Sequence, residues 1–153
     1  MRKFLALAMV AGLVFIFSDR AIADDASECE ALVKKAAAMC KERGVKATLL
    51  AIDDPSGPFV KGEVYVFALS LSMNAMDAHP HDKSIKRLPM GNISDSNGQK
   101  FFQKFKEVAE SQGSGWVEYT WVKPNESQPS RKRSFVMRVP DEDLYVGAGY
   151  YVK

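Results

Sequence analysis

The sequence has few of the residues from which catalytic and metal sites are usually built. Its 153 residues include two histidines and two cysteines. It has no glycine-rich loop that opens a helix, no serine in a nucleophile elbow and no HExxH sequence. These absences count against phosphate binding, acyl transfer and zinc-protease chemistry. We therefore expect a protein that is not an enzyme and that has no cofactor.

An excess of charge of one sign is also missing. The chain has 21 Lys and Arg and 19 Asp and Glu, a net charge of +2. That excess comes from residues 1–23, which contain three basic residues and one acidic residue, so that residues 24–153 are neutral overall. A neutral domain lacks the basic surface that attracts phosphate backbones. We therefore expect no nucleic-acid partner.

Long hydrophobic runs are absent except at the N-terminus. A cationic start precedes residues 4–17, which carry no charge, and Ala21-Ile22-Ala23 then offers small side chains for a peptidase. The run is shorter than the roughly 20 residues that cross a bilayer. The pattern predicts a signal peptide over 1–23 and one domain over 24–153, periplasmic or secreted after cleavage. The alternative is a signal retained as a membrane anchor.

The apolar periodicity predicts an α+β fold. Apolar residues recur at helical spacing over 25–44, and a shorter helical turn is expected at 47–52. A further helix is predicted at 101–113 by its phenylalanine spacing. Strands are predicted at 63–70, 74–79, 116–123, 132–139 and 144–152. Consecutive strands favour an antiparallel sheet with helices packed on it.

The two cysteines, Cys29 and Cys40, both fall within the first predicted helix. Eleven residues of helix place them about 16 Å apart on one face, too far for a disulfide. Buried free thiols are the favoured interpretation. The alternatives are a bridge to a second chain or a helix that is broken between them.

Aromatic residues gather in the predicted strands. In 116–123, Tyr119 and Trp121 share one face while Trp116 lies on the other. Tyr65 and the glycine-containing strand 144–152 add to this group. For any single ring an ordinary core is the better interpretation. Several polar rings beside glycines, however, predict a concave and partly polar cavity.

Lys132 is the candidate charged group for this cavity. In Arg131-Lys132-Arg133 the middle residue faces away from its neighbours, so Lys132 alone would point inward. A single ammonium among aromatic rings suits a small carboxylate.

A metal site is a weaker hypothesis. His79 and His81 stand with Asp77 and Asp82 in DAHPHD. Four such residues in a surface turn are usually only solvated. A metal-dependent enzyme is therefore the lowest of the hypotheses.

Five segments together resemble the single Cache domains of bacterial extracytoplasmic sensors. They are GPFVKGEVYVF (57–67), AHP (78–80), GSGWVEYTW (113–121), KRSFV (132–136) and LYVGAGYY (144–151). The resemblance implies a long N-terminal helix packed on a PAS-like five-stranded antiparallel sheet, with a pocket between the sheet and its covering loops. It also implies short carboxylates as ligands and a role in chemoreceptor or kinase signalling.

The resemblance places particular residues at or near that pocket. They are Tyr65, His79, Trp116, Tyr119 and Lys132, with Lys132 as the partner of the carboxylate. The chain departs from the family pattern at Phe135, where a tyrosine is common.

Two functional hypotheses follow. The leading one is an exported, non-catalytic domain that binds a small organic acid and acts through a partner protein, as in chemotaxis. The other is an interaction module with a vestigial pocket, which docks on a membrane receptor or transporter or forms a homodimer through 25–44.

Overall fold

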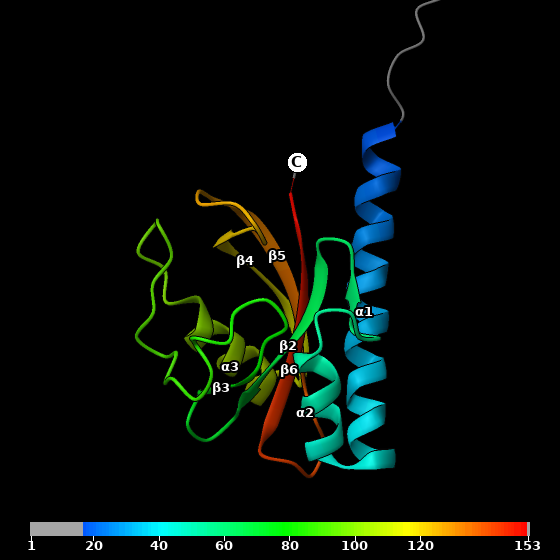
Figure 1. Cartoon of the computed structure of the whole chain (residues 1–153). Helices are drawn as coiled ribbons and strands as arrows, with labels where there is room; N and C mark the ends of the chain where they lie inside the picture. Colours follow the sequence, from blue (N-terminus) through cyan, green and yellow to red (C-terminus); the bar gives the residue numbers. More distant parts are fainter. Residues whose placement is uncertain (1–16, 153) are drawn as a thin grey trace, which may run out of the picture.

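A long helix packs along one side of the molecule (Figure 1). The computed structural model describes residues 17–152, with side chains from residue 24 onward. Helix α1 (Phe17–Arg43) contains the predicted helix 25–44 and begins earlier, so it continues through the predicted cleavage site. The hydrophobic residues before it lie outside the described part of the chain, and cleavage of residues 1–23 stays a prediction. None of the helices within 17–152 combines the length and hydrophobicity that a bilayer crossing requires.

A second helix follows directly. Gly44 has a φ of 83°, a left-handed conformation that glycine adopts without a steric penalty. It separates α1 from α2 (Val45–Asp53), which extends the predicted short turn at 47–52 to a full helix. Ile52 is buried in the core between these helices and the sheet. The two helices therefore form one layer.

The sheet has six strands and is antiparallel throughout its recorded pairings. The strands are β1 (Val60–Lys61), β2 (Val64–Ser70), β3 (Met76–Ala78), β4 (Ser114–Val122), β5 (Pro129–Arg138) and β6 (Leu144–Tyr151). Their order is β1-β2-β6-β5-β4, and β3 pairs with β2. The predicted α+β fold is confirmed. The sixth strand is β1, a short edge strand that pairs Val60 with Tyr65 across the turn at Gly62.

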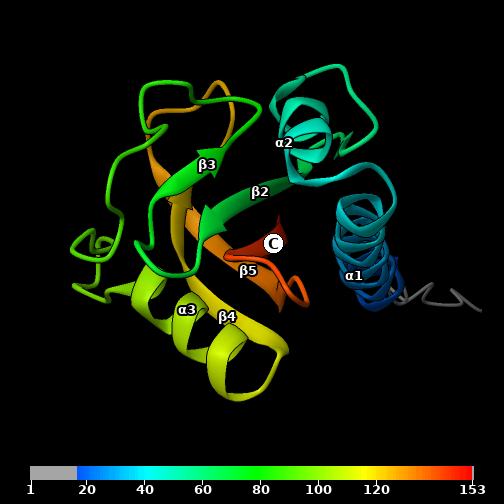
Figure 2. The ribbon, with the colours of Figure 1, turned by 90° about the horizontal axis from the view of Figure 1, so that it is seen from below.

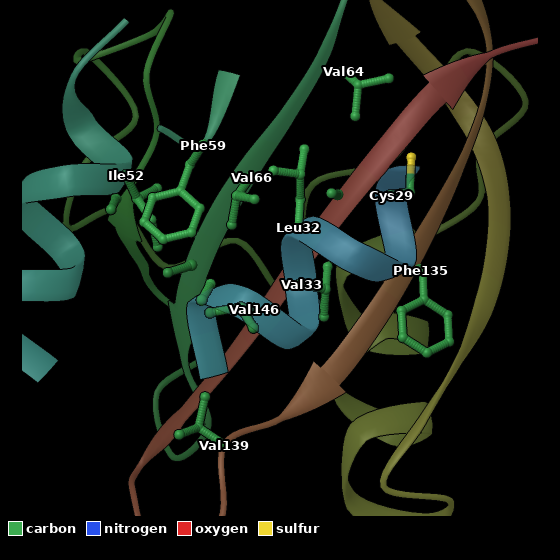
Figure 3. Packing of buried hydrophobic residues seen from close by; sticks show 14 of the residues in the cluster. Cys29, Leu32, Val33, Ile52, Phe59, Val64, Val66, Phe135, Val139 and Val146 are labelled. Carbon is green, nitrogen blue, oxygen red and sulfur yellow. The ribbon is translucent and has the colours of Figure 1, made fainter. Parts of the chain in front are cut away.

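The two faces of the sheet have different covers. Helices α1 and α2 lie on one face, and α3 (Phe101–Ser111) lies on the other (Figure 2). Strand alternation divides the side chains: Val64 and Val66 of β2 join the core under α1, while Tyr65 and Phe67 join the core under α3. Figure 3 shows Cys29, Leu32 and Val33 of α1 packed in the first of these cores.

Cys29 and Cys40 are both free and buried. The prediction of buried thiols is confirmed. Burial raises the pKa of the Cys29 thiol to about 12, so it stays protonated and is a poor nucleophile. Both residues act as small apolar side chains in the core under α1.

Candidate functional site

A small cavity lies between the sheet and α3, on the face away from α1. Aromatic and apolar side chains make most of its wall, and they are Phe67, Met76, Phe101, Phe102, Phe105 and Trp121. The other lining residues are Tyr65, His79, Tyr119 and Lys132. Its volume is about 10 Å³, close to the minimum that holds one water molecule. The side chains of these residues thus leave very little free space between them.

Lys132 brings the only buried ammonium group into this wall among the described residues. Its side chain points inward from β5 as the strand alternation predicts, and the residue is 1% exposed. Its Nζ lies 3.8 Å from the centroid of the Tyr65 ring and 4.9 Å from that of Tyr151. Within residues 17–152, no carboxylate forms an ion pair with Lys132. Ring quadrupoles offset only part of the cost of burying a cation.

The glycines of β6 make room for these side chains. A Cβ on Gly149 would lie 2.9 Å from Lys132 Cε and 2.1 Å from Ser134 Oγ. A Cβ on Gly147 would lie 2.5 Å from the Phe67 ring. The predicted concavity beside these glycines therefore exists, but Phe67 and Lys132 fill most of it.

His79 offers the cavity a second hydrogen-bond donor, besides the ammonium group of Lys132. Its Nδ1 accepts hydrogen bonds from the backbone N–H groups of His81 (3.3 Å) and Asp82 (3.0 Å), so the ring proton lies on Nε2. Burial, together with the charge of Lys132, lowers the pKa of His79 to about 3. The imidazole is therefore neutral and does not add a second positive charge to the site.

Tyr119 contributes a buried hydroxyl. Its Oη lies 2.9 Å from Ser134 Oγ, and its ring stacks on Phe101 with centroids 4.4 Å apart. Burial raises the pKa of Tyr119, so the phenol keeps its proton. The ring is fixed between the sheet and α3, and its hydroxyl is a neutral donor or acceptor.

Trp116 is not among the residues that line this cavity, although the family resemblance implied a position at or near the pocket. Its ring packs against Phe135 and Tyr150 on the face toward α1. The physical reason is the two-residue period of β4, which turns Trp116 away from Tyr119. Phe135 lies on the α1 face as well. The loss of a hydroxyl at that position therefore does not alter the cavity.

Trp121 takes the place expected of Trp116. It shares the face of Tyr119 and lines the cavity, as the alternation along the strand already indicated. It also lines a larger surface depression of about 370 Å³, to which Tyr65 and His79 contribute as well. These three rings therefore form the partition between the cavity and the outside.

The DAHPHD segment shows no arrangement of metal ligands. The Nδ1 atom of His79 already accepts two backbone hydrogen bonds, and the His79 and His81 ring centroids are 6.4 Å apart. In the part of the chain that the structure describes, no three His, Cys, Asp or Glu side chains gather as a metal site would require.

Comparison with known proteins agrees with this architecture. A model of the Cache domain family matches residues 45–153. The methyl-accepting chemotaxis protein McpP of Pseudomonas putida is 30% identical over 77 residues, which are 50% of this chain and 14% of that protein. The chain thus spans a small part of that relative's length.

Three solved structures are similar over 89% of this chain. A periplasmic sensor domain of a chemotaxis protein is 25% identical, with a TM-score of 0.66 and 95% of its length covered. A Cache chemosensory domain solved for its carboxylic acid recognition is 21% identical, with a TM-score of 0.66 and 93% covered. A methyl-accepting chemotaxis protein from Vibrio parahaemolyticus is 17% identical, with a TM-score of 0.73 and 94% covered.

Proposed function

This chain belongs to the Cache domain family, and we propose that it is an extracytoplasmic sensor domain that binds a small carboxylate without catalysis. One observation carries the proposal. Lys132 is a buried cation at the wall of a cavity, and within residues 17–152 it has aromatic rings but no carboxylate as its partners. A ligand carboxylate would supply the missing charge.

The neighbouring groups suit the same ligand. His79 is neutral and carries its ring proton on Nε2, and Tyr119 has a protonated hydroxyl, so both can donate to a carboxylate oxygen. The walls beyond them are aromatic and apolar, which suits a short hydrocarbon portion. The carboxylic acid recognition of a similarly folded Cache domain supports this ligand class.

The small volume of the cavity limits the size of the ligand. A space of about 10 Å³ does not admit even a two-carbon acid without movement of a wall. The partition of Tyr65, His79 and Trp121 is the part that separates the cavity from the outside depression. We expect acids of two to four carbons to bind as this partition shifts, since a longer chain would have to extend past the partition into the depression.

The family supports a location and a kind of partner. A similar structure is a periplasmic sensor domain of a chemotaxis protein, which supports an extracytoplasmic location. In this proposal residues 1–23 are a signal peptide and residues 24–153 are one Cache domain. Ligand binding then acts through a signalling partner, such as a membrane receptor.

Isothermal calorimetry of the purified protein with acids of two to four carbons tests the proposal. The variant Lys132→Met keeps the length of the side chain and removes its charge. Loss of a charged hydrogen bond, worth about 1.5–3 kcal/mol, predicts affinity at least about tenfold weaker. Lys34→Met, at an exposed lysine of α1, is the control and should bind as the wild type does. Absence of binding by the wild type, or equal binding by Lys132→Met, would contradict the proposal.

A second candidate function is an interaction module whose pocket is vestigial. The small volume of the cavity is the observation that favours it. This candidate predicts a concentration-dependent mass in analytical ultracentrifugation without any ligand, and no calorimetric response to the acids. The sensor proposal predicts the calorimetric response.

A further inference from the structure

We propose that Asp53, which is not among the residues that line the cavity, is the positioning residue for His79 and joins helix α2 to the wall of the binding site. The proposal deepens the proposed function, because it rests on the cavity being the ligand site. It concerns a side chain that neither the motif spacing nor the family resemblance singled out.

The contacts of Asp53 converge on the backbone of His79, at the two peptide units that flank its Cα atom. Its Oδ1 accepts a hydrogen bond of 3.0 Å from the backbone N–H of His79. The same oxygen lies 3.4 Å from Lys83 Nζ, which in turn donates to the backbone carbonyl of His79 at 3.0 Å. Asp53 Oδ2 pairs with Lys86. One carboxylate thus holds the N–H of His79 directly and its carbonyl through Lys83.

The position of Asp53 in α2 indicates that its carboxylate stabilises residues 79–86 and not its own helix. It is the last residue of α2, where the helix dipole is negative and a carboxylate is unfavourable. Burial by itself would raise the pKa of Asp53. The hydrogen bond from Lys86, that from His79 and the charge of Lys83 outweigh burial and lower the pKa. The carboxylate is therefore stabilised by residues 79–86 and not by α2.

The two fixed peptide units set the position of the imidazole. From this backbone the ring turns back, so that Nδ1 accepts hydrogen bonds from the N–H groups of His81 and Asp82 and the ring centroid lies 5.0 Å from that of Tyr65. Pro80 lies inside this turn and restricts its backbone. A shift of Asp53 would therefore move the ring with its peptide.

The connection extends to the long helix. Ile52, next to Asp53, is buried in the core that α1 shares with the sheet, and α2 packs on α1 (Figure 2). The route from the cavity runs from the His79 ring to its peptide, to Asp53, and then to α2 and α1. Movement of His79 on ligand binding would thus shift Asp53 and, with it, the C-terminal end of α2.

The spectrum of the His79 imidazole tests the proposal without any ligand. The titratable groups near His79 are Asp53 of α2, Lys132 of β5, and His81, Asp82 and Lys83 of its own segment. In wild type, long-range ¹H–¹⁵N spectra should show a neutral ring protonated on Nε2 whose shifts do not change from pH 8 to pH 5. In Asp53→Ala the ring should lose its two backbone donors, and its pKa should rise toward the ordinary 6.5.

Two further variants separate positioning from a general effect on folding. Asp53→Asn keeps an oxygen that accepts from the His79 N–H, so it should restore the wild-type spectrum in part. Asp54→Ala removes an adjacent, exposed carboxylate that bonds only to Ser56 in the described structure, and it should change nothing. Alanine is a better helix former than aspartate, so α2 should persist in Asp53→Ala by circular dichroism. An Asp53→Ala spectrum equal to the wild-type one would overturn the proposal.

Calorimetry with a two-carbon and a three-carbon acid then connects the positioning to binding. Asp53→Ala should weaken affinity about tenfold, as expected when one hydrogen bond to a charged group is lost, and Asp53→Asn should lie between it and the wild type. If no acid binds to the wild type, the proposed function fails. The His79 spectrum alone then decides whether Asp53 is the positioning residue.

Discussion

The ammonium group of Lys132 lies 3.8 Å from the centre of the Tyr65 ring. Cross-strand pairing explains this contact, because Tyr65 pairs with Gly149 of β6 and Gly149 pairs with Ser134 of β5. The missing side chain at Gly149 lets Lys132 lie along β6 and reach Tyr65. The cation is thus held by the sheet itself before any ligand arrives.

This arrangement predicts that Lys132→Met stabilises the ligand-free protein. The substitution removes a buried charge that rings compensate only in part, and it keeps an apolar stem of similar length. The free energy of unfolding should rise by about 1 kcal/mol, within the range seen when buried charges are replaced by apolar groups. Urea denaturation without ligand measures it. Stability lower than that of the wild type would show that the rings compensate the charge fully.

Gly149→Ala should be destabilising. Its Cβ would lie 2.1 Å from Ser134 Oγ and 2.6 Å from the carbonyl oxygen of Arg133, and the carbonyl cannot move without distorting β5. Overpacking of this kind costs about 1–3 kcal/mol. Gly91→Ala is the matched control, because its Cβ would meet its nearest neighbour at 3.6 Å. Thermal unfolding should separate the two variants, and equal melting temperatures would contradict the expectation.

Stability should fall as the pH is lowered through the range in which His79 of the unfolded chain becomes protonated. The pKa of His79 is about 3 in the folded protein and 6.5 ordinarily, so between these values the unfolded state binds the additional proton. The contribution is fully present above pH 6.5 and is lost toward pH 3, with a slope of at most about 1.4 kcal/mol per pH unit.

Denaturation of His79→Gln between pH 7 and pH 5 checks this expectation. The variant should show a flatter dependence on pH than the wild type. His81 is exposed, so His81→Gln should keep most of the slope. A wild-type slope in His79→Gln would show that another group is responsible.

Much of this site was accessible from the sequence because it depends on strand periodicity. The period of two placed Lys132 inward between two arginines and placed Tyr119 and Trp121 on one face. The same rule turns Trp116 to the other face, whereas the family resemblance placed it at or near the pocket, because a motif records order and spacing and not the face of a strand. The alternation along a strand was thus sufficient to predict the direction of a side chain where the backbone is regular.

The contact between Asp53 and His79 was not accessible in this way. It joins residues 26 positions apart, and residues 79–87 are irregular, so that no repeating pattern indicates where a side chain points. Arg87 in this segment has a positive φ of 63°. Only glycine indicates such a backbone conformation reliably in a sequence. The small volume of the cavity could not be predicted for a related reason. It depends on how α3 packs on the sheet, and the sequence of α3 predicts only that its phenylalanines are buried.

Trp121→Ala should change the size of ligand that the site accepts. The indole is one of three rings that line both the 10 Å³ cavity and the 370 Å³ depression, so its removal should join the two spaces. Acids of five or six carbons should then bind, while affinity for the two-carbon acid should fall about tenfold as contacts are lost.

Trp116→Ala is the matched control for this change. It removes the same ring from the same strand, but on the face toward α1. It should lower the melting temperature, because the contacts of a half-buried ring with the core under α1 are lost, and leave the order of affinities along the acid series unchanged. Calorimetry over acids of two to six carbons distinguishes the two variants. If Trp121→Ala kept the wild-type order, Tyr65 and His79 would suffice to close the cavity and would set its size limit.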